Sequence, residues 1–195
     1  MENRRDFIRK AGMAAAGIGM SAGLPLDALA GARARVGANG KINVGVIGIN
    51  GMGWSGLKSM MKIPEVNVMG LCDVDDNVLN WRKYELAKAG IATTAYTDHR
   101  KLLDNKDIDV VIIGTPDHWH CLQMADACFA GKDVYVEKPA GNSIEECNVM
   151  SAVQRKTGRI VQCGQWQRSV PHFVDALNFV RSGRSEEHTS ELQSH

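Results

Sequence analysis

The sequence predicts an α/β fold in which helices cover both faces of a doubly wound parallel sheet. Strand and helix patterns alternate between residues 41 and 183, which is typical of parallel strands joined by right-handed helical crossovers. The run IDVVIIG at residues 108–114 is almost wholly apolar, as expected of a strand that is covered on both faces. Glycine directly follows several of the predicted helices, at the position where a helix commonly ends.

Six strands are predicted from short runs rich in β-branched and apolar residues: residues 41–47, 66–73, 93–96, 108–114, 133–136 and 159–164. Five helices are predicted from apolar residues at helical spacing: residues 54–62, 77–89, 118–130, 143–157 and 170–182. Ser143 suits the N-cap of the fourth helix, and Gly90, Gly131 and Gly158 suit helix ends. A sheet of this type binds ligands at the carboxyl ends of its strands, so the residues after each strand are the candidate site.

Composition excludes several other classes of function. The 195 residues carry a net charge of +1 and only 6% aromatic residues, which argues against a nucleic-acid partner. The five cysteines contain no C-x-x-C pair, so neither a disulfide framework nor a zinc site is indicated. His118 and His120 lack a suitably spaced third ligand, and no metal is expected. His99 and His172 are expected at the surface or in helices, without a role.

Residues 1–34 have the three parts of an export signal. The pair Arg4-Arg5 is followed by Phe7, then by a weakly apolar, glycine-rich stretch and small-residue cleavage sites. This arrangement resembles a twin-arginine signal, which implies passage through the twin-arginine export machinery in a folded state and a periplasmic location. Pro25 interrupts the apolar stretch, so it is a poor membrane span. The alternative is a basic amphipathic helix. Residues 35–40 are expected to be a linker.

The last segment, residues 184–195, reads RSEEHTSELQSH and departs abruptly from the preceding pattern. The string matches the translation of a common short-read sequencing adapter. We therefore expect the natural reading frame to leave this sequence near Gly183, and we assign no chemistry to His188 or His195. The alternative is a genuine solvated tail, which is the usual interpretation of a polar run.

A glycine-rich loop, residues 48–53, joins the first strand to the first helix. Tight turning, close approach to a pyrophosphate and close helix packing require residues without side chains, and a helix N-terminus attracts phosphate. Gly48 and Gly53 match the dinucleotide fingerprint G-x-G-x-x-G, but Asn50 replaces its second glycine. Asparagine tolerates positive φ, which keeps the turn possible. Pyrophosphate contact is expected to shift to the backbone of Gly51 and Met52.

Asp73 ends the second strand, 20 positions after Gly53, where a carboxylate accepts hydrogen bonds from the adenosine ribose. A carboxylate there repels a 2′-phosphate, and no arginine or lysine follows before Arg82. The loop, helix and acid together predict a Rossmann domain that binds NAD in preference to NADP. The alternative is a strand-end turn formed by Asp73 and Asp75.

Two further motifs follow the fourth and fifth strands: TPDHWH at residues 115–120 and EKP at 137–139. Together with the glycine-rich loop and the phrases GKDVYVEKP and GQWQRS, they resemble the Gfo/Idh/MocA family of oxidoreductases. The resemblance extends over residues 41–183. It implies a nicotinamide ring beside the fourth and fifth strand ends.

The resemblance also implies roles for individual residues. Lys138 lies beside the reacting carbon, partly buried, and moves the proton of the substrate hydroxyl while hydride passes to the nicotinamide. Glu137 contacts the cofactor ribose and holds Lys138. The nicotinamide side of the pocket is lined by Thr115, Pro116 and His120. The substrate is contacted by Gln165 and Arg168. The alternative for Glu137 and Lys138 is an exposed ion pair, which contributes little to stability.

The expected organisation is a dinucleotide-binding domain at residues 41–165 and the start of a truncated second α/β domain at 166–183. In the family, that missing domain covers the nicotinamide and supplies a histidine and an aspartate. Three hypotheses follow: an oxidoreductase acting on a sugar or polyol, an NAD-dependent glycoside-cleaving enzyme that oxidises its substrate transiently, and a non-catalytic nucleotide-binding fragment. Assembly of the full-length protein into a homo-oligomer stays open.

Overall fold

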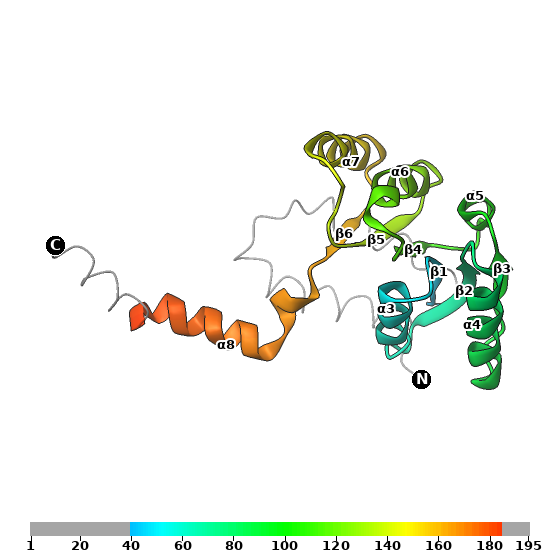
Figure 1. The fold of residues 1–195 in the computed structure, drawn as a ribbon, viewed down its shortest axis with the longest axis horizontal. Helices are drawn as coiled ribbons and strands as arrows, with labels where there is room; N and C mark the ends of the chain where they lie inside the picture. Colours follow the sequence, from blue (N-terminus) through cyan, green and yellow to red (C-terminus); the bar gives the residue numbers. More distant parts are fainter. Residues whose placement is uncertain (1–39, 185–195) are drawn as a thin grey trace, which may run out of the picture. The chain divides into compact units, whose positions relative to one another are not determined.

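The computed structural model describes residues 40–184. The expected export signal, most of the linker and residues 185–195 lie outside the described residues. Within them, helices cover both faces of a parallel sheet (Figure 1). This arrangement confirms the predicted α/β class.

The sheet has six parallel strands in the order β3-β2-β1-β4-β5-β6. This is the doubly wound order of a dinucleotide-binding sheet. The strands are β1 (Ile42–Ile47), β2 (Val66–Cys72), β3 (Thr94–Tyr96), β4 (Val110–Ile113), β5 (Asp133–Glu137) and β6 (Val161–Gly164). All six predicted strands are present, and β1 and β4 are neighbours at the point where the strand order reverses.

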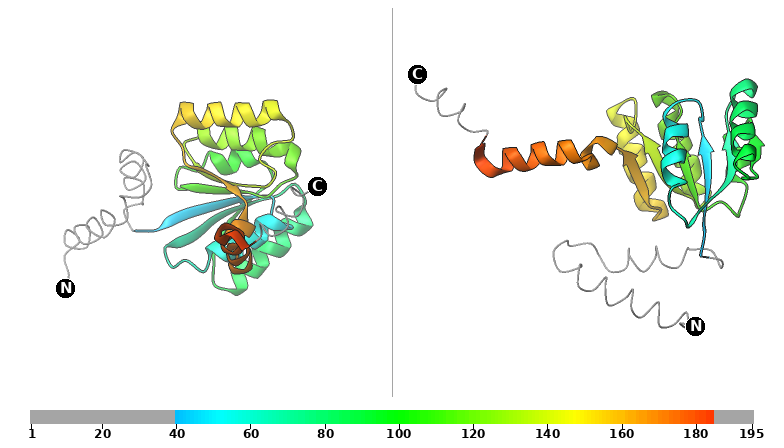
Figure 2. Two further views of the ribbon diagram at one scale, coloured as in Figure 1. Left: turned by 90° about the vertical axis from the view of Figure 1, so that its left-hand side faces the viewer. Right: turned by 90° about the horizontal axis from the view of Figure 1, so that it is seen from below.

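Helices α3 and α4 pack on one face of the sheet, and α5, α6 and α7 pack on the other (Figure 2). The described helices are α3 (Met52–Met60), α4 (Asp76–Lys88), α5 (His99–Leu103), α6 (His120–Phe129), α7 (Ile144–Thr157) and α8 (Pro171–Phe179), the last of which packs on neither face. The short turns are η1 (Asp117–Trp119), η2 (Trp166–Ser169) and η3 (Val180–Arg184).

Local capping explains where several helices begin and end. The Asp75 carboxylate accepts hydrogen bonds from the Asn77 and Val78 amides and starts α4. The Ser143 hydroxyl accepts from the Glu146 amide and starts α7, which ends at Gly158 with φ of 63°. Each cap satisfies backbone groups that lack a partner inside the helix, as the sequence predicted for α7.

Two apolar cores lie on opposite faces of the sheet. In β4, Ile112 packs with the core beneath α3 and α4, while Val111 and Ile113 pack with the core beneath α5, α6 and α7. All three side chains are fully buried. The apolar run at 108–114 was predicted to be covered on both faces, and the structure confirms this.

Three helices differ from the sequence predictions. α3 begins at Met52, two residues earlier than predicted, directly after the Gly51 N-cap. The five-residue helix α5 was not predicted, because one helical turn carries too little periodicity to recognise. The predicted helix at 118–130 is divided into η1 and α6.

Helix α8 differs from the others in its environment. Every one of its residues is exposed, including Phe173, Leu177 and Phe179. Among residues 40–184, no helix is both long enough and apolar enough to cross a membrane.

Candidate functional site: a cleft at the strand ends

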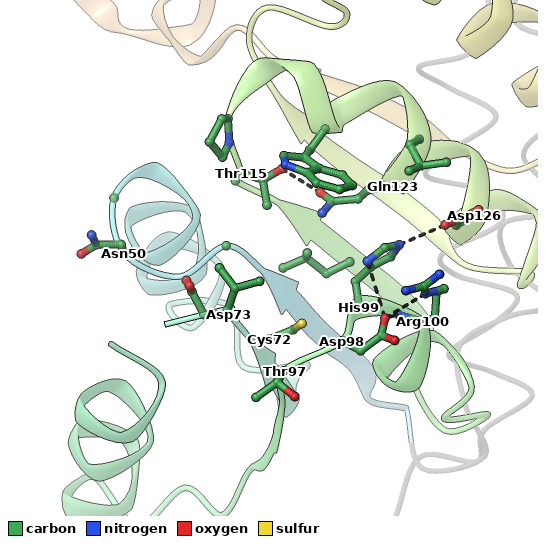
Figure 3. Close-up of a pocket in the computed structure, with 18 residues that line it drawn as sticks. Asn50, Cys72, Asp73, Thr97, Asp98, His99, Arg100, Thr115, Gln123 and Asp126 are labelled. Atoms are coloured by element: carbon green, nitrogen blue, oxygen red, sulfur yellow. Dashed lines mark hydrogen bonds and ion pairs between the residues drawn. The ribbon is translucent and has the colours of Figure 1, made fainter. Parts of the chain in front are cut away.

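A cavity of about 1030 Å³ opens at the carboxyl ends of β1, β2 and β4 (Figure 3). Its walls are the glycine-rich loop, the exits of β2 and β3, and one side of α6. The two centre strands, β1 and β4, diverge here into α3 on one face and α6 on the other. The cavity therefore lies at the topological switch point where sheets of this class bind ligands.

Three glycines make the floor of this cavity possible. Gly48 has φ of +80°, and a Cβ on it would lie 2.7 Å from the Thr115 nitrogen. A Cβ on Gly53 would lie 1.9 Å from the Gly48 oxygen, and one on Gly114 would lie 2.4 Å from the Gly53 Cα. Loop, helix and β4 therefore touch backbone to backbone. Sequence analysis missed Gly114, whose position directly after a buried strand was its only signal.

Asn50 does not adopt the positive φ that the sequence suggested for it. No described residue other than glycine has a positive φ, so the turn does not use the tolerance of asparagine for that conformation. Gly48 alone supplies the positive φ within the loop. Asn50 and Gly51 both line the cavity, and a Cβ on Gly51 would meet no atom within 4 Å.

Asp73 fastens the loop to the exit of β2. Its carboxylate accepts hydrogen bonds from the Ile49 amide at 2.9 Å and from the Asp75 amide at 3.1 Å. Each carboxylate oxygen retains further acceptor capacity, and Asp73 lines the cavity (Figure 3). Beside it, burial, followed by the charges of Asp73 and Asp98, raises the pKa of the Cys72 thiol to about 12, so this thiol is neutral.

The exit of β3 adds a polar cluster that sequence analysis did not assign to the site. The His99 ring lies 2.9 Å from Asp126 and 3.9 Å from Asp98, and all three residues line the cavity (Figure 3). Hydrogen bonds from the Arg100 side chain and amide lower the pKa of Asp98. His99 does lie in a helix, α5, but its side chain is only 12% exposed. Its place after a strand was the signal that could have identified it.

The exit of β4 is held by two side chains of α6. The Thr115 hydroxyl donates to the Gln123 side-chain oxygen at 2.7 Å. His120 is 1% exposed, with Nδ1 2.6 Å from the Pro139 oxygen and Nε2 2.9 Å from the Thr115 oxygen. The expectation that His120 lines the pocket is therefore corrected: the ring lies behind the wall and connects the exits of β4 and β5.

Glu137 and Lys138 differ sharply in environment. Glu137 is 4% exposed and accepts a hydrogen bond from the Lys138 amide at 3.3 Å. It lines a second cavity, of about 450 Å³, together with Met52 and Trp166. Lys138 is exposed rather than partly buried, and a cis peptide bond joins it to Pro139. A buried glutamate also does not fit the alternative of an exposed ion pair.

The structure thus distributes the residues selected from the sequence over two cavities. Six of them line the larger cavity: Gly48, Asn50, Gly51, Asp73, Thr115 and Pro116. Met52 and Glu137 line the smaller one. Gly53, His120, Lys138, Gln165 and Arg168 line neither, and the last two are exposed at the start of the segment that leads to α8.

The two histidines of the TPDHWH motif do not face a common point. His118 is exposed, with Nδ1 3.7 Å from the Asp117 carboxylate, whereas His120 is buried. Across residues 40–184, no group of three histidine, cysteine, aspartate or glutamate side chains is arranged to hold a metal ion.

Comparison with known proteins gives matches along most of the chain. A family model described as an oxidoreductase family with an NAD-binding Rossmann fold, Gfo/Idh/MocA, matches residues 42–165. A glycosyl hydrolase family 109 protein from Solibacter usitatus is 32% identical over 194 residues, which are 93% of this chain and 43% of that protein. An alpha-N-acetylgalactosaminidase from Shewanella oneidensis is 32% identical over 198 residues, with the same coverage. The chain thus spans less than half the length of these relatives.

The fold of this chain also matches solved structures of inositol dehydrogenases. Myo-inositol 2-dehydrogenase from Lactobacillus plantarum superposes with a TM-score of 0.67 at 29% identity, covering 74% of this chain and 42% of that one. Scyllo-inositol dehydrogenase from Lactobacillus casei, solved with bound NAD(H) and scyllo-inositol, superposes with a TM-score of 0.66 at 27% identity and the same coverage.

Proposed function

Because this chain belongs to the Gfo/Idh/MocA oxidoreductase family, with its NAD-binding Rossmann fold, we propose that the larger cavity binds NAD(H) in preference to NADP(H). We further propose that the whole protein oxidises or reduces a hydroxyl-bearing carbon of a sugar or polyol. Relatives named as inositol dehydrogenases and as an alpha-N-acetylgalactosaminidase support this substrate class.

The residues around the loop fit the pyrophosphate of a dinucleotide. Gly48, Gly53 and Gly114 leave no room for a Cβ, so the first turn of α3 approaches the end of β4 closely. Gly51 and Met52 stand at the N-terminus of α3, where unpaired amides and the helix dipole favour phosphate. The backbone amides of Gly51 and Met52, together with that of Asn50 before them in the loop, are the proposed phosphate ligands.

The position of Asp73 is the observation that carries the preference for NAD. Its carboxylate is at the exit of β2 and lines the cavity, where it can accept hydrogen bonds from both ribose hydroxyls. A 2′-phosphate in that place would face a negative charge. Arg82, the first basic residue after β2, donates to carbonyl oxygens of the loop and does not line the cavity.

Dissociation constants for NADH and NADPH, measured by fluorescence titration, test this assignment. We expect Asp73→Asn to weaken NADH binding about tenfold, because a hydrogen bond to a charged group contributes about 1.5–3 kcal/mol, and to narrow the preference over NADPH. The matched control is Asp75→Asn, which removes a charge two residues away and keeps a good N-cap for α4. Equal binding of NADH and NADPH by the unmodified chain would contradict the proposal.

The catalytic role is proposed for Lys138. The bound nicotinamide would supply the hydride acceptor or donor. The neutral Lys138 amine would accept the hydroxyl proton as the substrate is oxidised, and the Lys138 ammonium would donate it back when the carbonyl is reduced. Lys138 is exposed at the exit of β5, which leaves its amine accessible to a substrate. In a protein of the full length of its relatives, Lys138→Met should lower kcat about 10²- to 10⁴-fold and leave the NADH dissociation constant unchanged. A retained kcat would refute the assignment.

The named relatives favour a second candidate, which is glycoside cleavage with transient oxidation. In such a reaction a hydride leaves the sugar for the cofactor and returns before product release, so cofactor is not consumed and water enters the cleaved bond. An aryl N-acetylgalactosaminide distinguishes the two candidates. Release of many aryl groups per enzyme without net NADH formation supports cleavage, whereas one NADH formed per substrate oxidised supports the dehydrogenase.

We also propose export to the periplasm by the twin-arginine machinery, on the basis of the Arg4-Arg5 pair. The expected result is periplasmic protein from the unmodified gene and cytoplasmic precursor when Arg4→Lys and Arg5→Lys are combined. Unchanged export of the doubly substituted protein would contradict this route.

A further inference from the structure

The guanidinium of Arg82, on α4, is buried where a charge is costly. Arg82 is 8% exposed. Its Cζ lies 4.5 Å from the ring centroid of Trp54 and 3.8 Å from that of Trp81. Arginine is rarely buried to this extent unless its charge and N–H groups have partners. The partners of the Arg82 guanidinium therefore indicate why it is buried here.

Two N–H groups of the Arg82 guanidinium donate hydrogen bonds to the glycine-rich loop. Nε donates to the Ile49 oxygen at 3.3 Å and Nη2 donates to the Asn50 oxygen at 3.1 Å. Nη1 donates to the Glu85 carboxylate on the next turn of α4. The guanidinium therefore connects α4 to two successive peptide groups of the loop.

The geometry of these peptides fixes where the loop amides point. In a trans peptide the carbonyl and the following N–H point in opposite directions. The Ile49 and Asn50 carbonyls face Arg82, so the Asn50 and Gly51 amides face away from it. Both residues line the larger cavity. Within the described part of the chain, neither amide donates a hydrogen bond to another protein group.

We infer that Arg82 is a positioning residue, which holds the loop so that the Asn50 and Gly51 amides face the pyrophosphate of a bound dinucleotide. This inference rests on the proposal that the cavity binds NAD(H). Arg82 acts from behind the loop and does not itself contact the ligand.

The residue type suits this task. A planar guanidinium presents several donors in a fixed fork, whereas a lysine ammonium is a single point charge on a flexible stem. The two tryptophan rings stack on the guanidinium and fix its plane. Lysine at position 82 would keep the charge but lose the paired contact with two adjacent carbonyls.

The test compares three ligands on the full 195-residue chain by calorimetry: adenosine, ADP and NADH. We expect Arg82→Met to weaken ADP and NADH at least about tenfold, which corresponds to about 1.4 kcal/mol, and to leave adenosine within about twofold. Arg82→Lys should show the same selectivity with a smaller loss. The matched control, Glu85→Gln, removes the ion pair and keeps the loop contacts, so all three affinities should stay within about twofold.

Two results would overturn the inference. A parallel loss for adenosine, ADP and NADH in both Arg82 variants would show a general structural role. Unchanged ADP and NADH affinities in both would show that the loop amides are held without Arg82. If Arg82→Met does not fold, Arg82→Lys decides alone, since it keeps the charge and most of the stem. Failure of the unmodified chain to bind any of the three ligands would instead refute the cofactor proposal, before any variant is compared.

Discussion

Gly53 is the position where one added methyl group should have the largest effect. A Cβ there would lie 1.9 Å from the Gly48 oxygen, whereas real Cβ contacts are essentially never closer than 3.0 Å. The obstacle is backbone, so the start of α3 or the loop must move by about 1 Å. Overpacking of this kind costs about 1–3 kcal/mol, and we expect the upper end for Gly53→Ala. For a chain of this size the melting temperature should fall by roughly 6–12 °C.

Gly56→Ala, one turn later in α3, is the matched control. A Cβ there would lie 3.7 Å from the Ile112 Cγ2, an ordinary contact. Alanine is favoured over glycine in a helix interior by about 0.5–1 kcal/mol, so this variant should be more stable than the parent chain. Urea unfolding followed by circular dichroism measures both. A transition midpoint for Gly53→Ala equal to or above that of the parent would refute the steric argument.

Three further outcomes are expected. Burial is the main cause that raises the pKa of the Cys72 thiol to about 12, so about one molecule in ten thousand carries its thiolate at pH 8. Iodoacetamide should therefore label the exposed Cys147 long before it labels Cys72, as measured by mass spectrometry of peptides. Burial, then the charge of Lys106, lowers the pKa of Lys132. Between that lowered pKa and the ordinary value of 10.5, the unfolded chain binds more protons than the folded chain, so the free energy of unfolding should rise with pH in this window. Urea unfolding of Lys132→Met should show no such rise. Leu57 is fully buried on the sheet-facing side of α3, so Leu57→Ala should lower the free energy of unfolding by about 2–5 kcal/mol. A loss below about 1 kcal/mol would show that the site collapses around the missing atoms.

Local patterns were sufficient to predict the architecture. Alternating strand and helix signals predict a parallel sheet, because each helical crossover returns the chain to the end of the sheet where the strands begin. The loop at 48–53 and Asp73 follow two such strands, and the parallel sheet brings the two strand ends together. Their proximity could therefore be predicted from positions along the chain, and the hydrogen bond from the Ile49 amide to Asp73 agrees with it.

The contacts that the sequence could not reveal join distant segments. Gly114 must lack a side chain because Gly53 packs on it, and nothing near Gly114 in the sequence records that neighbour. Arg82 looked like an ordinary helix residue, and its role depends on the loop 32 and 33 positions earlier. The contacts of His120 depend equally on the exit of the fifth strand, which places the Pro139 carbonyl oxygen 2.6 Å from its Nδ1.

The His120 bridge has a thermodynamic consequence. The ring contacts the Thr115 oxygen at the exit of β4 and the Pro139 oxygen beside Lys138, and Thr115 is itself bonded to Gln123 on the wall of the larger cavity. A displacement of either exit therefore strains the other. Two ligands that each favour the same placement of this bridge bind with linked affinities, and the factor by which the first strengthens the second equals the factor by which the second strengthens the first.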